Sequence, residues 1–268
     1  MKKEENAPTP SVRALERGLQ LLDYLIEIRE GRLNHIAEVN GLPPSTAHRL
    51  LQALEQHGYV VSKVHGVYRL GVKGLWFTSL REPVRQILDE LRRGSGETAN
   101  FAMLVQDEME YVERAVSDHA LAFVVSVGTH IPLNCSALGK AVLAFRPGML
   151  DCIKMERRTA HSITDTVELH ADLEVARHRG FAIDNEEYFE GVYCLAVPVF
   201  DGEGAAVGGL SISGPTVRFA REQAFEQADL LKAAGERVTH LLSGRSENHC
   251  EALGPTISET PGGKKHGT

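Results

Sequence analysis

The stretch GLPPSTAHRLLQALEQHGYVVSKVHGVYRL, residues 41–70, decides the fold of the first part of the chain. Its proline pair can begin a helix, because the N–H groups of a first helical turn have no partner within the helix. The helix should reach about residue 57 and end at Gly58. Two short β-prone runs follow, at residues 59–62 and 67–70. The stretch therefore predicts a helix followed by a β-hairpin.

Two further helices are expected before this stretch. A long one covers residues 11–30, with Ser11 as its cap and Gly31 as its stop, because its apolar residues have helical spacing: Val12, Leu15, Leu19, Leu22 and Ile26. A short one covers residues 34–40, with Asn34 as its cap. Helix, helix, turn, helix and hairpin in this order predict a winged helix-turn-helix.

A helix-turn-helix places the first residues of its second helix against base edges in the major groove. Here these residues carry hydroxyl, imidazole and guanidinium groups that can bind bases or phosphates: Ser45, Thr46, His48 and Arg49. Further phosphate-binding candidates are Lys63 and His65 near the wing tip, and Arg13 and Arg17 on the first helix. Serine and threonine at a helix start are often only a cap. The helix pattern alone supports a structural cap and a DNA-binding role about equally. The hairpin that follows it favours DNA binding.

The net charge is −7, which opposes DNA binding unless the charge is unevenly distributed. Residues 11–80 hold eight Lys or Arg against six Asp or Glu, whereas residues 81–243 hold 16 against 25. We therefore expect the first part to approach the duplex and the acidic part to be held away from it.

The second part of the chain mixes strands and helices. Residues 75–93 form an amphipathic linker helix that we expect to be broken or kinked at Pro83. Expected strands are 101–105, 111–115, 121–127, 181–184, 194–200 and 206–213, and expected helices are 136–145, 169–179 and 221–242. This pattern predicts an α+β domain. The expected division is a disordered arm (1–10), the winged helix-turn-helix (11–74), the linker helix (75–96), the second domain (97–243) and a disordered tail (244–268).

No apolar run approaches the roughly 18 residues that a membrane-spanning helix needs, and no signal peptide is evident. We therefore expect a cytoplasmic protein that does not contact a membrane and whose cysteines are free thiols.

The motifs resemble those of the IclR family of bacterial transcription regulators. Residues 41–51 and 58–71 resemble the recognition helix and wing, and SALGKA (136–141), DNEE (184–187), GVYCLAVPV (191–199) and LSISGP (210–215) resemble the effector domain. The resemblance covers residues 11–243. It implies a GAF-like effector-binding domain that binds a small organic acid, and a homodimer or homotetramer. It also implies binding to a double-stranded DNA operator, at which most family members repress transcription. Two departures are Pro44, where the family often has Lys or Arg, and a shorter stretch between residues 70 and 97.

The resemblance also implies an effector site. Carried over by motif, its residues are Ile131, Ala137, Leu138, Asp184, Val192, Cys194, Ser211 and Ser213. The two serines alternate along one strand and so face the same side. Their hydroxyls, the thiol and the N-terminus of helix 136–145 suit a carboxylate. Asp184 would repel it unless it accepts a ligand hydroxyl, which favours a hydroxy or keto acid. The run 199–219 is similar to sugar-acid-responsive members.

Several simpler interpretations remain open. Lys140 can be a helix-surface charge and Cys194 plain core, whereas Glu186 and Glu187 can be a solvated loop or a structural ion pair. A redox or metal sensor could use Cys135, Cys194, His119 and His130, although their spacing gives no metal geometry.

An enzyme is the remaining alternative. Residues 209–213 approach a nucleophile elbow but lack its last glycine, and Gly202 and Gly204 fit a hairpin better than a dinucleotide fingerprint. We expect a regulator with no catalytic residue, metal or cofactor.

Overall fold

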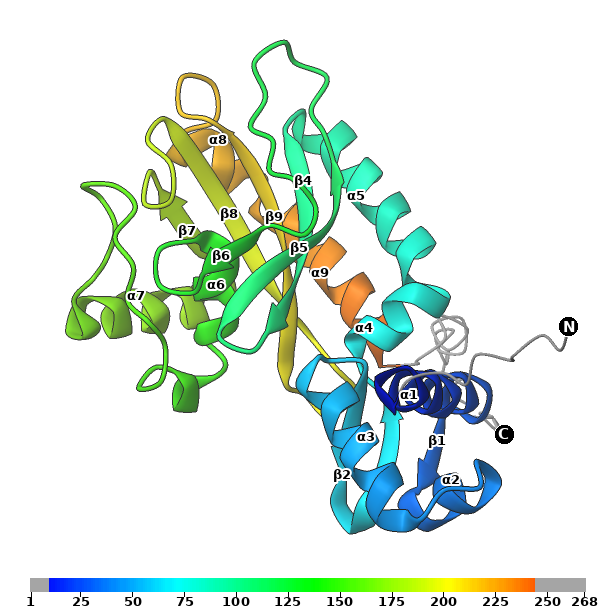
Figure 1. Cartoon of the computed structure of the whole chain (residues 1–268). Coiled ribbons are helices and arrows are strands. Elements are labelled where there is room, and N and C mark those ends of the chain that lie inside the picture. The colour runs from blue at the N-terminus through cyan, green and yellow to red at the C-terminus, as the bar shows by residue number, and fades with distance from the viewer. Residues whose placement is uncertain (1–9, 244–268) are drawn as a thin grey trace, which may run out of the picture.

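The structure is a computed structural model that describes residues 10–243. A winged helix-turn-helix lies at one end and a sheet covered by helices at the other (Figure 1). The predicted arm over residues 1–10 and tail over 244–268 lie outside the described residues, except Pro10, with which the first helix begins. Within the described part, no helix is both long and apolar enough to cross a membrane.

The winged helix-turn-helix forms around a small apolar core. Its elements are α1 (Pro10–Ile28), β1 (Glu30–Arg32), α2 (Leu33–Val39), α3 (Pro44–Gln56), β2 (Val60–Lys63), the turn η1 (Val64–Gly66) and β3 (Val67–Leu70). Leu21 and Leu25 of α1 pack with Ile36 of α2 and with Ala47 and Leu51 of α3. The helical spacing of these apolar side chains explains why the three helices pack together.

Three local predictions in this part were wrong. Helix α1 begins at Pro10, so Ser11 lies inside its first turn and is not its cap. The short strand β1 was not predicted. Only its pairing with β3 distinguishes these three extended residues from a loop. Arg32 rather than Asn34 occupies the cap position of α2, so Asn34 lies inside the first turn.

A continuous helical connection leads to the second domain. It consists of α4 (Val72–Leu75), the π-helical turn η2 (Trp76–Leu80) and α5 (Arg81–Ser95). It begins at Val72, inside the range predicted for the winged helix-turn-helix, and it is not broken at Pro83. The wide turn ends three residues before Pro83, which has no N–H to donate to the carbonyl of Ser79 in that turn.

The second domain contains one antiparallel sheet with the strand order β6-β5-β4-β9-β8-β7. The strands are β4 (Thr98–Val105), β5 (Glu108–Ala115), β6 (His130–Pro132), β7 (Ala182–Asn185), β8 (Val192–Phe200) and β9 (Ala206–Pro215). The predicted strand 121–127 is wrong, because this segment is a loop. Its side chains Leu121, Val124 and Val127 are exposed and have no partner strand, so β propensity alone does not make them a strand.

Helices cover both faces of the sheet (Figure 1). The chain adds α6 (Ala137–Leu143), the short turn η3 (Pro147–Met149), α7 (Thr166–Arg179), α8 (Arg221–Glu226) and α9 (Ala228–Leu242). The predicted single helix 221–242 is two helices that meet at Gln227. Leu210 and Ile212 of β9 pack against the α5 and α9 side, so Ser211 and Ser213 point to the side covered by α6.

Candidate functional site

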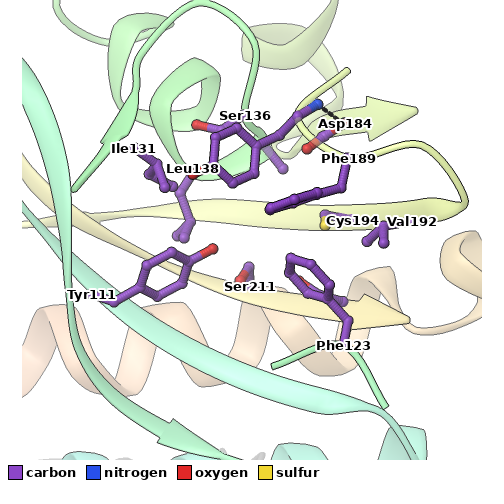
Figure 2. A pocket seen from close by; sticks show the side chains of 13 residues that line it. Tyr111, Phe123, Ile131, Ser136, Leu138, Asp184, Phe189, Val192, Cys194 and Ser211 are labelled. Atoms are coloured by element: carbon purple, nitrogen blue, oxygen red, sulfur yellow. Dashed lines mark hydrogen bonds between the residues drawn. The ribbon is translucent and has the colours of Figure 1, made fainter. Parts of the chain in front are cut away.

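A cavity lies between α6 and the sheet (Figure 2). The empty space around its lining, open solvent included, amounts to about 300 Å³, but in this conformation the side chains leave room inside for only about one water molecule. The structure brings all eight residues of the expected effector site into its lining: Ile131, Ala137, Leu138, Asp184, Val192, Cys194, Ser211 and Ser213. Their role in binding stays a prediction.

Five further lining residues were missed: Tyr111, Phe123, Ser136, Tyr188 and Phe189. Tyr188 and Phe189 follow the DNEE motif directly, and this adjacency could have indicated them. Phe123 could not be found, because its loop was taken for a strand. The rings of Phe123 and Phe189 meet edge to face, with centroids 5.4 Å apart, so aromatic side chains from two loops close around the cavity.

Polar side chains form a row across the floor of the cavity. Asp184 of β7 pairs in register with Cys194 of β8, which pairs with Ser213 of β9. Beside them, Asn100 of β4 donates from Nδ2 to Ser211 Oγ at 3.3 Å. Ser213 Oγ and Asn100 Oδ1 are buried and make no hydrogen bond of ordinary geometry within the described residues. Buried polar atoms are normally paired, so the hydroxyl of Ser213, which lines the cavity, indicates a place for a bound molecule.

Asp184 is buried with one oxygen already used. Its Oδ1 accepts hydrogen bonds from the backbone N–H groups of Glu187 at 2.7 Å and Tyr188 at 3.3 Å. Burial raises the pKa of the Asp184 carboxyl to about 7; the Glu187 carboxylate adds to this rise and Lys140 opposes it. A carboxyl group with such a pKa exists in both protonation states near neutral pH.

Helix α6 gives less to a ligand than its motif suggested. It has seven residues and ends at Leu143, and Ser136 caps it by accepting a hydrogen bond from the N–H of Gly139 at 3.1 Å. The same hydroxyl donates to the carbonyl of Pro132 at 2.7 Å. A helix this short with a capped first turn is a weak carboxylate site, so the expectation for helix 136–145 loses support.

Gly139 allows α6 to approach the segment before it. A Cβ at this position would lie 2.4 Å from Leu133 Cα, closer than real Cβ contacts occur. Gly139 is therefore needed because any side chain at this position would prevent α6 from packing against Leu133.

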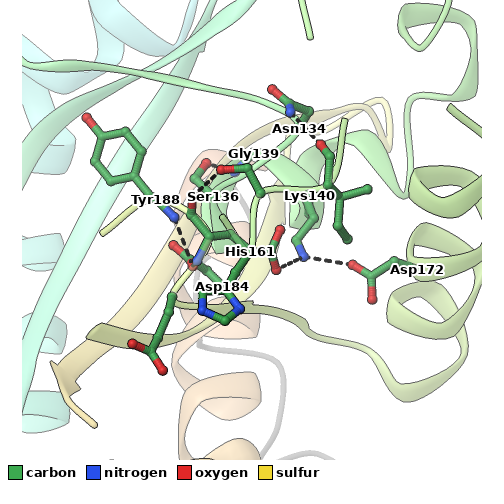
Figure 3. Close-up of polar contacts among 12 residues, drawn as sticks. Asn134, Ser136, Gly139, Lys140, His161, Asp172, Asp184 and Tyr188 are labelled. Carbon is green, nitrogen blue, oxygen red and sulfur yellow. Dashed lines mark hydrogen bonds and ion pairs between the residues drawn. The ribbon is translucent and has the colours of Figure 1, made fainter. Parts of the chain in front are cut away.

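Lys140 is buried at the base of the site (Figure 3). Its Nζ lies 2.6 Å from Glu187 Oε1 and 2.8 Å from Asp172 Oδ2 of α7. Burial lowers the pKa of this amine, but the two carboxylates outweigh burial and raise it. The interpretation of Lys140 as a helix-surface charge was wrong, and Glu187 belongs to a buried ion pair. The ion triad joins α6, α7 and the loop that follows Asp184.

Hydroxyl groups hold the same loop from its other side. Thr159 Oγ1 donates to the carbonyl oxygen of Glu186 at 2.6 Å, and Ser162 Oγ donates to that of Glu187 at 2.6 Å. Glu186 has a φ of 61°, which is uncommon for a residue other than glycine. The loop beside the cavity is therefore held in one conformation by contacts on two sides.

The cysteines do not favour redox or metal chemistry. Burial raises the pKa of Cys135 to about 12 and that of Cys194 well above its usual value, so both remain thiols. Over residues 10–243, no group of three His, Cys, Asp or Glu side chains is arranged to hold a metal ion. His130 instead lies 3.1 Å from Glu108.

The expected DNA-binding side chains lie on the outside of the winged helix-turn-helix. Ser45, His48 and Arg49 of α3 are exposed and Thr46 is half-buried, whereas Ala47 and Leu51 face the core. His48 Nδ1 lies 2.9 Å from the hydroxyl of Tyr68 in the wing, which orients its ring.

The other expected DNA-binding side chains differ in whether they already have a partner within the protein. Lys63 Nζ lies 3.0 Å from Glu30 Oε2, so its charge is paired in this conformation. His65 is exposed at the wing tip with a φ of 65°, and Arg13 and Arg17 are exposed on α1.

Ion pairs connect the two domains. Arg69 of β3 approaches Asp201 at 3.5 Å and Glu203 at 3.3 Å, both in the turn between β8 and β9. Lys73 of α4 lies 2.7 Å from Glu110 of β5. Both contacts reach strands that also line the cavity, since β5 carries Tyr111 and β9 carries Ser211.

Both parts of the chain match known families. Residues 14–63 match the IclR helix-turn-helix domain, and residues 74–240 match the C-terminal domain of the bacterial transcriptional regulator IclR. The chain belongs to the IclR family. As a family member it is a DNA-binding transcriptional regulator with an effector-binding domain and not an enzyme.

Curated IclR-family proteins match over most of their length. The HTH-type transcriptional regulator BhcR of Paracoccus denitrificans is 34% identical over 88% of this chain and 89% of its own. The transcriptional repressor IclR of Escherichia coli is 31% identical, over 88% and 92%. KdgR of the same organism is 31% identical, over 85% and 92%.

A solved IclR structure shares the fold. The crystal structure of Thermotoga maritima IclR is similar with a TM-score of 0.59 and 28% identity, over 87% of this chain and 99% of that one. The winged helix-turn-helix followed by a mixed α/β effector-binding domain is thus confirmed, and the redox, metal-sensing and enzyme alternatives gain no support.

Proposed function

We propose that this IclR-family regulator is a repressor whose operator binding is controlled by a small organic acid bound in the cavity between α6 and the sheet. The observation that carries the proposal is the hydroxyl of Ser213 in the cavity floor, which is buried and has only the weakly hydrogen-bonding thiol of Cys194 beside it. A carboxylate or hydroxyl oxygen of a ligand would supply a stronger partner.

The other groups of the cavity suit the same class of ligand. Ser211 and Cys194 can donate to oxygen atoms, and the hydroxyl of Tyr111 points toward the middle of the lining side chains (Figure 2). The second oxygen of Asp184 makes no hydrogen bond with the described residues and can contact a ligand hydroxyl. A sugar acid offers both kinds of group, which agrees with the resemblance of residues 199–219.

The DNA-binding side chains of the proposal are Ser45, Thr46, His48, Arg49, Lys63, His65, Arg13 and Arg17. Because helix-turn-helix proteins usually bind paired half-sites, we propose a homodimer or homotetramer as the active form. The pairing of Lys63 with Glu30 implies that this lysine must exchange partners when it binds a phosphate.

A thermal-shift screen of the purified protein against sugar acids, aromatic acids and glyoxylate tests the ligand site. An acid at ~100 times its Kd should stabilise the folded state by about 2.7 kcal/mol. The shift should be lost in the double variant Ser211→Ala/Ser213→Ala and kept in Ser79→Ala, a control on the helical connection. A shift that survives the double variant would place the ligand elsewhere.

A further inference from the structure

The cavity lacks a positive charge. Of the described residues that line it, none is Lys, Arg or His, and one, Asp184, carries a carboxyl group. The proposed ligand is an organic anion. Two carboxylates within hydrogen-bond distance in a buried site cannot both remain ionised at low cost.

The cations on the elements around Asp184 are committed to other partners. Lys140 of α6 lies between two carboxylates, so the buried triad that it forms with Glu187 and Asp172 carries a net negative charge. Arg158 pairs with Glu156 at 2.8 Å and lies over the ring of Tyr188. Neither can neutralise a ligand without leaving a carboxylate unpaired.

Asp184 itself has the geometry of a proton acceptor. Both of its backbone hydrogen bonds end on Oδ1, which leaves Oδ2 to carry a proton without losing a contact. Cys194 on the next strand and Ser213 on the strand after it lie beside Asp184 in register. A protonated Oδ2 would therefore add one hydrogen-bond donor to the thiol and hydroxyl donors of these residues.

We propose that the organic anion enters the cavity together with one proton from solvent, which Asp184 takes up and donates as a hydrogen bond to the ligand carboxylate. The inference rests on the proposed function and deepens it. A protonated Asp184 serves as a donor, so the ligand needs a carboxylate but no hydroxyl group. Proton uptake therefore also admits acids that lack a hydroxyl or keto group, which the expectation for Asp184 had not included.

Other titratable groups around Asp184 cannot take up this proton, and Tyr188, whose N–H contacts Asp184, has a phenol pKa that burial raises, so it stays neutral near pH 7. Cys194 of β8, Cys135 before α6 and Tyr111 of β5 all have raised pKa values and stay neutral near pH 7. Glu187 holds Lys140, and protonating it would break the buried pair. His161 lies on the turn that supports the loop and is exposed, so it requires a control.

Titration calorimetry on the full chain tests the proposal. Gluconate, benzoate and glyoxylate are each titrated at several values between about pH 6 and pH 9, where all three acids are ionised. Each acid is also titrated at about pH 7.5 in phosphate and in Tris, which both buffer there and whose different heats of ionisation reveal proton uptake. We expect affinity to fall by up to about tenfold per pH unit above the pKa of Asp184, with uptake of about one proton.

Variants of Asp184 and His161 test which side chain takes up the proton. Asp184→Asn keeps a neutral group that can donate to the ligand, so it should bind with an affinity that no longer depends on pH. His161→Gln should retain the pH dependence of the wild type. Binding that is independent of pH and buffer in the wild type would overturn the proton uptake and leave the proposed function standing. Loss of binding in a folded Asp184→Asn variant would also overturn it, because the ligand would then need the charged aspartate. No binding of any acid at any pH would remove the proposed function itself.

Discussion

Arg69 of the wing and Glu203 of the β8–β9 turn form an ion pair of 3.3 Å across the boundary between the two domains. Arg69 follows Tyr68, whose hydroxyl contacts His48 on α3, and Glu203 precedes the strand that carries Ser211. The ion pair therefore joins the wing, which contacts the DNA-binding helix, to the turn before the strand that lines the cavity.

Arg69→Gln should weaken the effect of the ligand on operator binding. A partly exposed ion pair contributes about 0–1 kcal/mol, so the ratio of operator Kd values with and without acid should fall by up to about fivefold. Fluorescence anisotropy with labelled operator measures this ratio. Arg93→Gln, an exposed arginine on α5, is the matched control. An unchanged ratio would show that the ion pair does not transmit the signal.

Lys140→Met should strongly destabilise the effector-binding domain. The substitution leaves Glu187 and Asp172 without their shared cation, and breaking a buried pair typically costs about 3–5 kcal/mol. Urea unfolding followed by circular dichroism measures the loss. Lys154→Met, at an exposed position, should change the free energy of unfolding by less than about 0.5 kcal/mol. A similarly small loss for Lys140 would mean that the buried triad is not needed for stability.

Asp184 should make the stability of the ligand-free protein depend on pH. Its pKa rises from 3.8 to about 7 on folding, so the folded state holds its proton more tightly than the unfolded chain. The free energy of unfolding should therefore fall as pH rises from about 4 to about 7 and then level off. Asp184→Asn removes this contribution and should be the more stable protein at pH 8, by at most about 4 kcal/mol. Equal stability of the two proteins at pH 8 would argue against a buried, ionised aspartate.

Arg49→Gln and Arg13→Gln should affect operator binding in different ways. Arg49 lies on α3 at the expected base edges, so its loss should cost about 1–3 kcal/mol and relax the preference at one base pair. Arg13 on α1 is expected to contact phosphate, so its loss should weaken binding to all sequences and reduce the salt slope by about one. Binding measured across operator variants and salt concentrations separates the two, and the reverse pattern would exchange the two roles.

The sequence alone predicted the winged helix-turn-helix, most of the strands of the second domain and eight of the 13 residues that line the cavity. Helical spacing, turn glycines and the proline pair act over a few residues, so the winged helix-turn-helix could be predicted from them. Seven of the eight effector-site residues could be located because they belong to contiguous motifs, and Ile131 lies five residues before the first of these. The division at residues 74 and 96 stays a prediction.

Only the tertiary structure decided which groups are buried and what they contact. Lys140 carries the same charge on a surface or in a core, and its burial results from Asp172 and Glu187, which are distant in the sequence. The apolar loop 121–127 has strand-like residues but no strand beside it. Tyr111 and Phe123 reach the cavity through sheet register and loop path. Such contacts depend on long-range pairing, which local spacing does not encode.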